Sequence, residues 1–221
     1  MPKRIGSEMR LVMISDTHGL HHKLNNIPEG DCLIHAGDFC NRGALEEAED
    51  FLKWFSNAPH PYKIFCAGNH DWCFEIAPTA AKALIPPNVV YLENSSINIS
   101  GYNFYGSPVT PWFLDWAFNV PRGADIKKYW DRIPEAGCVD VLITHGPPFG
   151  ILDQAVPMFG SEHLGCEELA ERVKDSVPLV HCFGHIHGGY GKSSIGQTQH
   201  FNCSQVNESY RVVNKPWVIE I

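Results

Sequence analysis

Five short apolar runs punctuate this chain, and each is followed by a polar side chain of a type that binds metal ions. Runs of roughly four to eight branched and apolar residues, bounded by turn residues, are typical of buried strands. Here they cover residues 11–15, 31–37, 62–68, 139–144 and 178–184. Open α/β sheets bind ligands where strands pass into loops. The pattern therefore predicts an α/β fold with polar ligands gathered along a single sheet edge.

The residues at these five strand ends combine carboxylate, amide and imidazole groups. In chain order they are Asp16, His18, Asp38, Asn69, His70, Asp71, His145, His185 and His187. Any one motif could arise by chance, and the Asn-His-Asp motif taken alone would suit a turn. Together they indicate a site for two metal ions, because no packing argument requires this set at five equivalent positions. Mixed nitrogen and oxygen ligands favour Mn, Fe or Zn over Ca or Mg.

Two divalent ions that act together lie about 3.5–4 Å apart and share a bridging ligand. Asp38 is the candidate bridge, because a carboxylate has oxygens to share and the preceding glycine allows close approach of the backbone. Asp16 and His18 are two residues apart and could chelate one ion. His185 and His187 have the same spacing, but in a turning loop they could bind one ion or two, and spacing does not decide between these alternatives.

The segments between the strands complete an α/β domain. Apolar residues over 44–55 recur with helical spacing, so a helix would join the strands before Asp38 and Asn69 in a right-handed parallel unit. Further helices are expected over 124–132 and 166–175, and antiparallel hairpins over 97–105 and 210–221. The length of 221 residues fits a single domain spanning 1–221.

Two long loops, 108–118 and 146–165, are candidates for the rim of the site, because loops of this length are usually functional. Trp112 and Trp116 in the first loop could wall a pocket for a nucleobase. Aromatic residues in such loops more often pack as a cap, and we expect packing here.

Seven histidines lie outside the five motifs. His35 and His181 fall within the apolar runs and are expected to be core residues with satisfied hydrogen bonds. His21 and His22 follow the first motif and could either be structural, which we favour, or approach a substrate.

The charge balance limits the class of partner. The chain carries 17 basic and 25 acidic residues, a formal net charge of −8, which argues against an extended surface for nucleic acid. A small phosphorylated substrate is the expected partner, since bound ions would offset the negative charge locally. The apolar run at 11–14 is too short for a signal peptide, and eight cysteines without a Cys-x-x-Cys pair indicate reduced thiols. We therefore expect a cytoplasmic protein without membrane attachment, and the sequence leaves open whether it forms a homodimer.

The motifs resemble, in order and spacing, those of the calcineurin-like metallophosphoesterase superfamily. They read Asp16-x-His18, Gly37-Asp38, Gly68-Asn69-His70-Asp71, His145-Gly146 and Gly184-His185-x-His187. The resemblance covers nearly the whole chain and extends to the metallophosphoesterase-domain-containing branch, which is related to class III cyclic nucleotide phosphodiesterases. It implies a four-layered fold in which two mixed β-sheets form a sandwich flanked by α-helices.

The resemblance also implies a role for each motif residue. One metal ion would be held by Asp16, His18, Asp38 and His187, and the other by Asp38, Asn69, His145 and His185. His70 would face the phosphate as a general acid or stabilise charge on the leaving oxygen, and Asp71 would orient His70.

The implied activity is that of a dinuclear-metal phosphodiesterase, with Mn favoured and Fe or Zn as alternatives. It would hydrolyse small phosphodiesters or cyclic nucleotides by in-line attack of a metal-bridging hydroxide. A phosphomonoesterase or a nuclease of the same fold is the main alternative within the enzyme class. A scaffold that binds a nucleotide or a partner and retains the metal site is the alternative outside it, although the intact His70 and Asp71 argue against this reading.

Overall fold

The computed structural model describes residues 8–155 and 162–221, and its strands belong mainly to two sheets. One sheet contains β1 (Arg10–Ile14), β2 (Cys32–Ala36), β3 (Tyr62–Cys66), β4 (Val90–Tyr91) and β13 (Trp217–Glu220). The other contains β5 (Ser95–Ile99), β6 (Tyr102–Ser107), β9 (Val141–Thr144), β10 (Val180–Phe183), β11 (Gly191–Ile195) and β12 (Thr198–Asn202). Their spatial orders are β13-β1-β2-β3-β4 and β11-β12-β10-β9-β6-β5. The short strands β7 (Thr110–Pro111) and β8 (Asn119–Val120) pair only with each other among the described residues.

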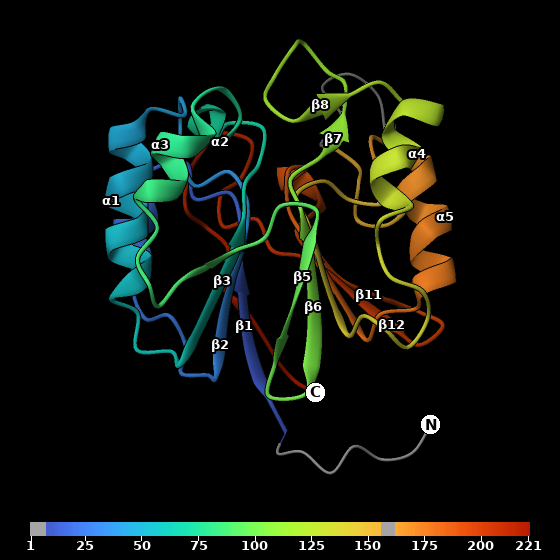
Figure 1. Cartoon of the computed structure of the whole chain (residues 1–221), viewed down its shortest axis with the longest axis horizontal. Helices are drawn as coiled ribbons and strands as arrows, with labels where there is room; N and C mark the ends of the chain where they lie inside the picture. The colour runs from blue at the N-terminus through green and yellow to red at the C-terminus, as the bar shows by residue number, and fades with distance from the viewer. Residues whose placement is uncertain (1–7, 156–161) are drawn as a thin grey trace.

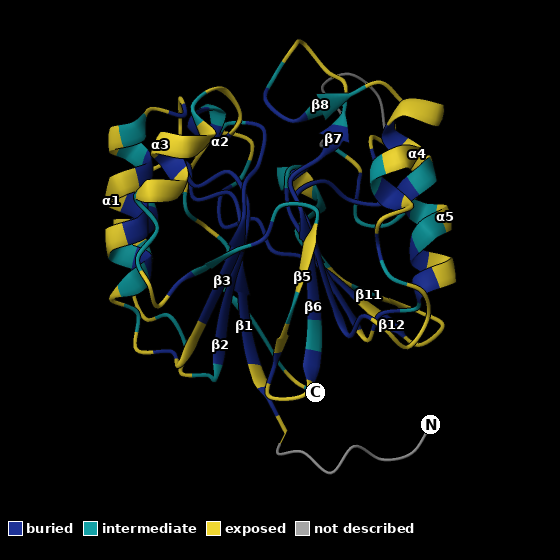
Figure 2. Cartoon of the chain, in the orientation of Figure 1, coloured by how far each residue is buried: buried dark blue, intermediate teal, exposed yellow. Residues whose placement is uncertain are grey.

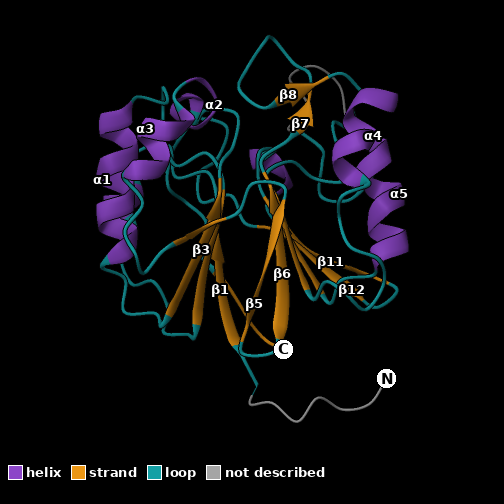
Figure 3. Ribbon diagram, viewed as in Figure 1, coloured by secondary structure: helices purple, strands orange, loops and turns teal. Residues whose placement is uncertain are grey.

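Helices cover the outer face of each sheet, as Figures 1 and 3 show. The first sheet carries α1 (Leu45–Ser56), α2 (Trp72–Ile76) and α3 (Pro78–Ala83), and the second carries α4 (Ala124–Trp130) and α5 (Glu167–Ser176). Two short 3-10 turns, η1 (His21–Lys23) and η2 (His187–Gly189), follow β1 and β10. The layers run helix, sheet, sheet, helix, so the predicted four-layered fold is confirmed.

Three apolar clusters hold these layers together. Alternate residues of β1 illustrate the arrangement: Leu11 and Met13 face the cluster between the sheets, whereas Val12 and Ile14 face the cluster beneath α1. A third cluster joins β9 to α4 and α5. Strands that are buried on both faces become continuous apolar runs, which explains the sequence pattern. Figure 2 shows the buried strands at the centre and exposed residues on the outer helices.

The helix of the first crossover forms as its sequence predicts. Ala48, Phe51, Leu52 and Phe55 lie on one side of α1 and are buried against the sheet. β2 and β3 are parallel neighbours, so the predicted parallel unit is confirmed. The hairpin of β5 and β6 and the helices α4 and α5 also lie where the sequence places them.

The expectation of a single sheet edge is wrong, because the five motif strands belong to two sheets. β1, β2 and β3 lie in the first sheet, while β9 and β10 lie in the second. The hairpin of β5 and β6 begins the second sheet; β9 pairs in parallel with β6, and β10 pairs in parallel with β9. The predicted ligands therefore come from two neighbouring sheets that share the cluster between them.

The expected hairpin over 210–221 is also wrong. β13 pairs antiparallel with β1, at the opposite end of the chain, with Val12 opposite Val218. The segment before it forms an isolated bridge between Val206 and Val212 instead of a strand that pairs with β13. Pairing with β1 places Trp217 and Ile219 against the cluster between the sheets, which a local hairpin would not achieve. No helix in the described ranges has the length and apolar character needed to cross a bilayer.

Candidate metal centre

The predicted ligands meet where the carboxyl ends of the two sheets adjoin. Two groups of side chains bring their ligand atoms within 4.8 Å of one another, and both draw on both sheets. The first comprises Asp16, His18 and His187; the second comprises Asp38, His145 and His185. Asn69 joins the second group through its contact with His145. The structure thus brings together all seven predicted metal ligands.

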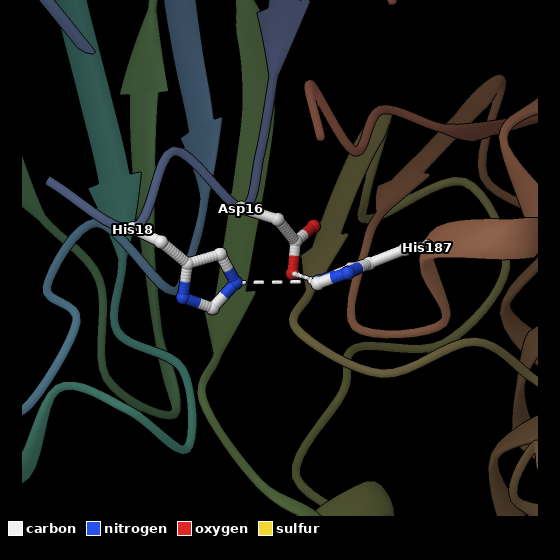
Figure 4. A group of neighbouring side chains, drawn as sticks. All are labelled: Asp16, His18 and His187. Carbon is white, nitrogen blue, oxygen red and sulfur yellow. Dashed lines mark hydrogen bonds and ion pairs between the residues drawn. The ribbon is translucent and has the colours of Figure 1, made fainter. Parts of the chain in front are cut away.

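Figure 4 shows the first group, in which Asp16 lies between the rings of His18 and His187. The Nε2 atoms of the two histidines are 3.2 Å apart, and the Nε2 of His187 is 3.5 Å from Asp16 Oδ1. Two ligands bound to one ion at about 2.1 Å, at angles of 90–110°, lie roughly 3.0–3.4 Å apart. The spacing in this group therefore suits a single ion.

The second group is built around Asp38 and His145. The Nε2 of His145 lies 3.2 Å from Asp38 Oδ2 and 2.9 Å from Asn69 Oδ1. Asp38 Oδ2 is also 3.9 Å from the Nε2 of His18 in the first group. Asp38 is therefore the carboxylate that lies between the two groups, as expected for a bridging ligand.

The hydrogen bonds of His145 indicate that a cation fits this group. Its Nδ1 lies 2.9 Å from the carbonyl oxygen of Ala36, so Nδ1 carries a proton and donates it. In a neutral ring the Nε2 then bears a lone pair, yet it faces the oxygens of Asp38 and Asn69. Three electron-rich atoms converge without a donor unless the ring is protonated or a metal ion lies between them. The donor set of nitrogen and oxygen atoms suits a borderline transition metal.

Backbone strain accompanies four of the proposed ligands. Asp16, His18, Asp38 and His185 all have positive φ, between 43° and 68°. This left-handed region is uncommon for residues other than glycine, and such strain clusters at functional sites. Glycine also makes room here, since a Cβ on Gly184 would lie 1.9 Å from Asp16 Oδ2.

Burial and the neighbouring carboxylates shift the pKa values of the histidines at this centre in opposite directions. Burial lowers the pKa of His18 to about 4 and the pKa of His185 to about 3, even though Asp38 and Asp16 act in the opposite direction. Burial also lowers the pKa of His145, but the Asp38 carboxylate outweighs it and raises that pKa to about 9. Without an ion, His18 and His185 are therefore neutral, whereas His145 is a cation paired with Asp38. Binding of a metal ion would displace the proton from His145, because ligation requires a neutral imidazole.

His70 lies at the edge of this centre. Its backbone N–H donates to Asp38 Oδ1 at 2.8 Å, and its ring atom Nδ1 lies 2.8 Å from the carbonyl oxygen of Asn41. The ligand atoms of His70, His18 and Asp38 also lie within 4.8 Å of one another. His70 thus adjoins the predicted bridging carboxylate.

Asp71, predicted to orient His70, lies beneath the two loops that meet at this histidine. The Asp71 carboxylate accepts backbone N–H bonds from Asp38, Gly68 and Cys40, at 2.9, 2.7 and 2.8 Å. It therefore ties the Asp38 loop to the Gly68 loop rather than contacting the ring of His70. The ring donates instead to the carbonyl oxygen of Asn41. This contact could not be predicted from the sequence, because every residue has a backbone carbonyl.

A cavity of about 410 Å³ opens over the centre. Its lining includes Asp38, Asn69, His70, His185 and His187 together with aromatic residues that the motifs do not contain. Trp116 stacks on His70 with ring centroids 4.3 Å apart, and Tyr210 meets the ring of His18 edge-on at 4.8 Å. Sequence reasoning missed Tyr210, because it treated this residue as part of a hairpin.

The loop 108–118 reaches the rim of this cavity through Phe113, Leu114 and Trp116, as predicted. The loop 146–165 reaches the rim through Ala155. Residues 156–161 of this loop lie outside the described residues, so the prediction for them is not tested. Packing as a cap is wrong for Trp112, because its side chain is 54% exposed.

The histidines outside the motifs described next do not line the cavity. His35 and His181 are buried, and they bond Thr17 and Thr144 at 3.0 and 2.8 Å. The prediction is confirmed for His35, whose other ring nitrogen accepts the backbone N–H of Gly37. For His181 only the core position is confirmed, because its Nδ1 is buried without a hydrogen-bond partner among the described residues. His21 and His22 turn away from the cavity and contact Asp50 on α1.

Comparison with known proteins agrees with this geometry. A model of the family described as calcineurin-like phosphoesterase matches residues 9–189. The chain is similar to human metallophosphoesterase domain-containing protein 1, with 39% identity over 235 residues that cover 96% of this chain and 71% of that protein. A UPF0046 protein of Caenorhabditis elegans is 37% identical over 226 residues, covering 96% of this chain and 75% of the relative.

Solved structures agree at the level of the fold. The crystal structure of TT1561 from Thermus thermophilus superposes with a TM-score of 0.61 at 15% identity and covers 89% of each chain. Another solved chain reaches a TM-score of 0.72 at 16% identity, covering 96% of this chain and 99% of its own length. The motifs, the two ligand groups and the family match lead to one conclusion: this chain belongs to the calcineurin-like phosphoesterase family.

Proposed function

We propose that this chain is a phosphodiesterase that uses two transition-metal ions, preferably Mn, to hydrolyse small phosphodiesters or cyclic nucleotides. The observation that carries the proposal is the placement of Asp38 between two ligand groups, at the floor of a cavity. Asp16, His18, Asp38 and His187 would hold one ion, and Asp38, Asn69, His145 and His185 the other. When bound, the ions would activate a water molecule and offset the charge that develops on the phosphoryl group.

The residues of the chain would position this chemistry. The buried contact of Asp71 with three backbone N–H groups fixes the loop that carries Asp38 relative to the loop that carries Asn69. Gly184 allows the Asp16 carboxylate to accept the backbone N–H of His185 at 3.0 Å. Both contacts hold ligand atoms in place before substrate arrives, which is the kind of preorganisation that catalysis exploits.

His70 would supply the proton for the leaving oxygen. Because Nδ1 faces the Asn41 carbonyl, Nε2 is the ring atom left for the substrate. A proton on Nε2 would make the ring an imidazolium, able to donate to the leaving oxygen and to stabilise its charge. Trp116, stacked on this ring, would exclude water from one face of it.

The cavity and the charge of the chain support a small substrate. A volume of about 410 Å³ is within the range of about 300–1,000 Å³ that small-molecule sites occupy. The net charge of −8 counts against a long polyanion such as a nucleic acid.

The test is a substrate panel for the chelator-treated chain reloaded with Mn²⁺. The panel comprises bis-p-nitrophenyl phosphate, cyclic nucleotides, p-nitrophenyl phosphate and an oligonucleotide. We expect Mn²⁺-dependent hydrolysis of the diesters, lowered by about 100-fold or more in kcat by Asn69→Ala or His145→Ala, as for removal of a group that stabilises the transition state. His163→Ala, which removes a histidine paired with Asp153 outside the cavity, is the control.

Two outcomes would redirect the proposal. Preferential hydrolysis of p-nitrophenyl phosphate or of the oligonucleotide would identify a monoesterase or a nuclease. Turnover that stays at the wild-type rate in both Asn69→Ala and His145→Ala would contradict the metal-dependent mechanism itself.

A further inference from the structure

A separate group of potential metal ligands lies beside α1, outside the candidate metal centre. It consists of His21 and His22 from η1 and Asp50 from α1, whose ligand atoms all lie within 4.8 Å of one another. Asp50 Oδ2 is 3.0 Å from the Nε2 of His21 and 3.0 Å from the Nε2 of His22. The two imidazole rings are adjacent, with centroids 4.3 Å apart. Three donors of the kind that bind transition metals thus converge on one point.

The protein fixes one side of this group and leaves the other open. His21 is fully buried, and its ring packs against Phe51 and Trp54 of α1 at 5.7 and 5.1 Å. The side chains of His22 and Asp50 are 58% and 55% exposed. One anchored ligand with two exposed ones leaves a face on which water could complete a four-coordinate shell, and it gives an ion a path of entry.

Neighbouring charges favour a cation at this place. The same stretch of α1 carries Glu46 and Glu49 close to Asp50, and both are exposed. Clustered carboxylates raise the local concentration of cations. A divalent ion would use a lone pair from each of the three groups. Two imidazole nitrogens and one carboxylate oxygen suit zinc better than the hard ions Mg²⁺ or Ca²⁺.

We propose that His21, His22 and Asp50 form a peripheral site for a borderline divalent transition-metal ion such as Zn²⁺. An ion there would join η1, which begins three residues after His18, to the helix that follows Asp38. The site would thereby clamp together η1 and α1, which follow the loops that carry His18 and Asp38, without contributing a ligand to the candidate metal centre.

Calorimetric titration of Zn²⁺ into chelator-treated protein at pH 7.5 tests this proposal. We expect His22→Ala and Asp50→Asn each to bind one equivalent of Zn²⁺ fewer than the wild type. His163→Ala, which disrupts a single histidine–aspartate pair instead of a three-donor group, should bind as many equivalents as the wild type. His22 is exposed, so His22→Ala is expected to retain the fold, which circular dichroism can verify.

The test is independent of the proposed function, because it compares the Zn²⁺ bound by the wild type with that bound by each variant and does not depend on the total number of ions bound. If the candidate metal centre bound no ion, the wild type would still exceed His22→Ala by one. Equal stoichiometry in the wild type, His22→Ala and Asp50→Asn would overturn the peripheral site. Turnover with Mn²⁺ should be unchanged in His22→Ala, and loss of that turnover would instead assign His22 to the catalytic machinery.

Discussion

At the scale of single residues, Asp16 shows how tightly the proposed ligands are constrained. Its carboxylate accepts the backbone N–H of His185 and faces the ring of His187, and its own backbone is left-handed with φ 52°. Gly184 lies so close to it that even one added methyl group has no space. A ligand held in this way has little freedom to relax when a neighbour changes.

Gly184→Ala is therefore expected to displace Asp16. The new Cβ would lie 1.9 Å from Asp16 Oδ2 and 2.1 Å from Ser15 Oγ. Overpacking of this kind costs about 1–3 kcal/mol, so we expect urea denaturation to show a loss in that range and calorimetry to show weaker metal binding. Gly191→Ala is the control, since its Cβ would meet the side-chain tip of Leu152 at 3.3 Å and the carbonyl oxygen of Gly189 at an ordinary contact distance of 3.6 Å. Equal effects of the two substitutions would contradict this account.

The stacking of Trp116 on His70 leads to a prediction about turnover. In Trp116→Ala the ring of His70 loses its stacked neighbour but keeps its bond to the Asn41 carbonyl. Because misplacement of a catalytic group by about 1 Å can cost 100-fold in rate, we expect kcat for a diester to fall roughly 10-fold to 100-fold. Trp112→Ala, in the same loop but exposed, should change kcat less than about 2-fold. A fall confined to KM would assign Trp116 to substrate binding only.

The ligands were predictable at this scale because each follows an apolar run directly, and the position of a strand end is visible in sequence. The residues that support them were not. Tyr210 reaches His18 from a segment nearly two hundred residues away in the chain. Asn41 contributes a carbonyl oxygen, which has no residue-specific pattern. Long-range contacts and backbone contacts therefore escaped the prediction.

At the scale of elements, β13 has a position that local pattern cannot specify. The apolar faces of α1 and α5 follow helical spacing, so those helices were predictable from sequence. β13 is a short apolar run, but its partner β1 lies at the other end of the chain. The local pattern predicts a hairpin with the apolar segment just before β13. Burial against the cluster between the sheets favours pairing with β1 instead.

The contribution of β13 can be measured with Trp217→Ala. Trp217 stacks on Tyr190 at 5.3 Å, and its Nε1–H donates to the carbonyl oxygen of Asn202 at 3.0 Å. Because the side chain is only half-buried, we expect a loss of about 2–3 kcal/mol in the free energy of unfolding, at the low end for an aromatic truncation. Val213→Ala, at an exposed position, should cost less than about 0.5 kcal/mol. No loss in Trp217→Ala would show that β13 does not stabilise the sheet.

At the scale of the whole molecule, the two sheets meet through an apolar cluster along their length and through the ligand groups at one end. Asp16, His18, Asp38 and Asn69 follow strands of the first sheet, while His145, His185 and His187 follow strands of the second. Each proposed ion would therefore be bound by both sheets at once. The ions would act as cross-links within the fold as well as in the chemistry.

Removal of metal should consequently lower the thermal stability of the chain. A ligand at 100 times its dissociation constant stabilises a protein by about 2.7 kcal/mol, and about 1 kcal/mol shifts Tm by roughly 2–4 °C at this size. We expect chelation to lower Tm by about 5–10 °C and Mn²⁺ to restore it, as measured by scanning calorimetry. His145→Ala should show a smaller response to chelation than the wild type. An unchanged Tm after verified removal of metal would contradict the cross-linking role.

The division of the ligands between two sheets also bears on how the chain is made. If only the first sheet has formed, the chain presents two carboxylates, one amide and one histidine of the proposed ligand set. If only the second sheet has formed, the chain presents three histidines and none of the proposed carboxylate ligands. Neither partial structure offers a complete set of donors, so an unfinished chain would hold the proposed ions weakly. Coordination of the proposed ions would thus depend on assembly, because the donor groups are complete only once both sheets have docked.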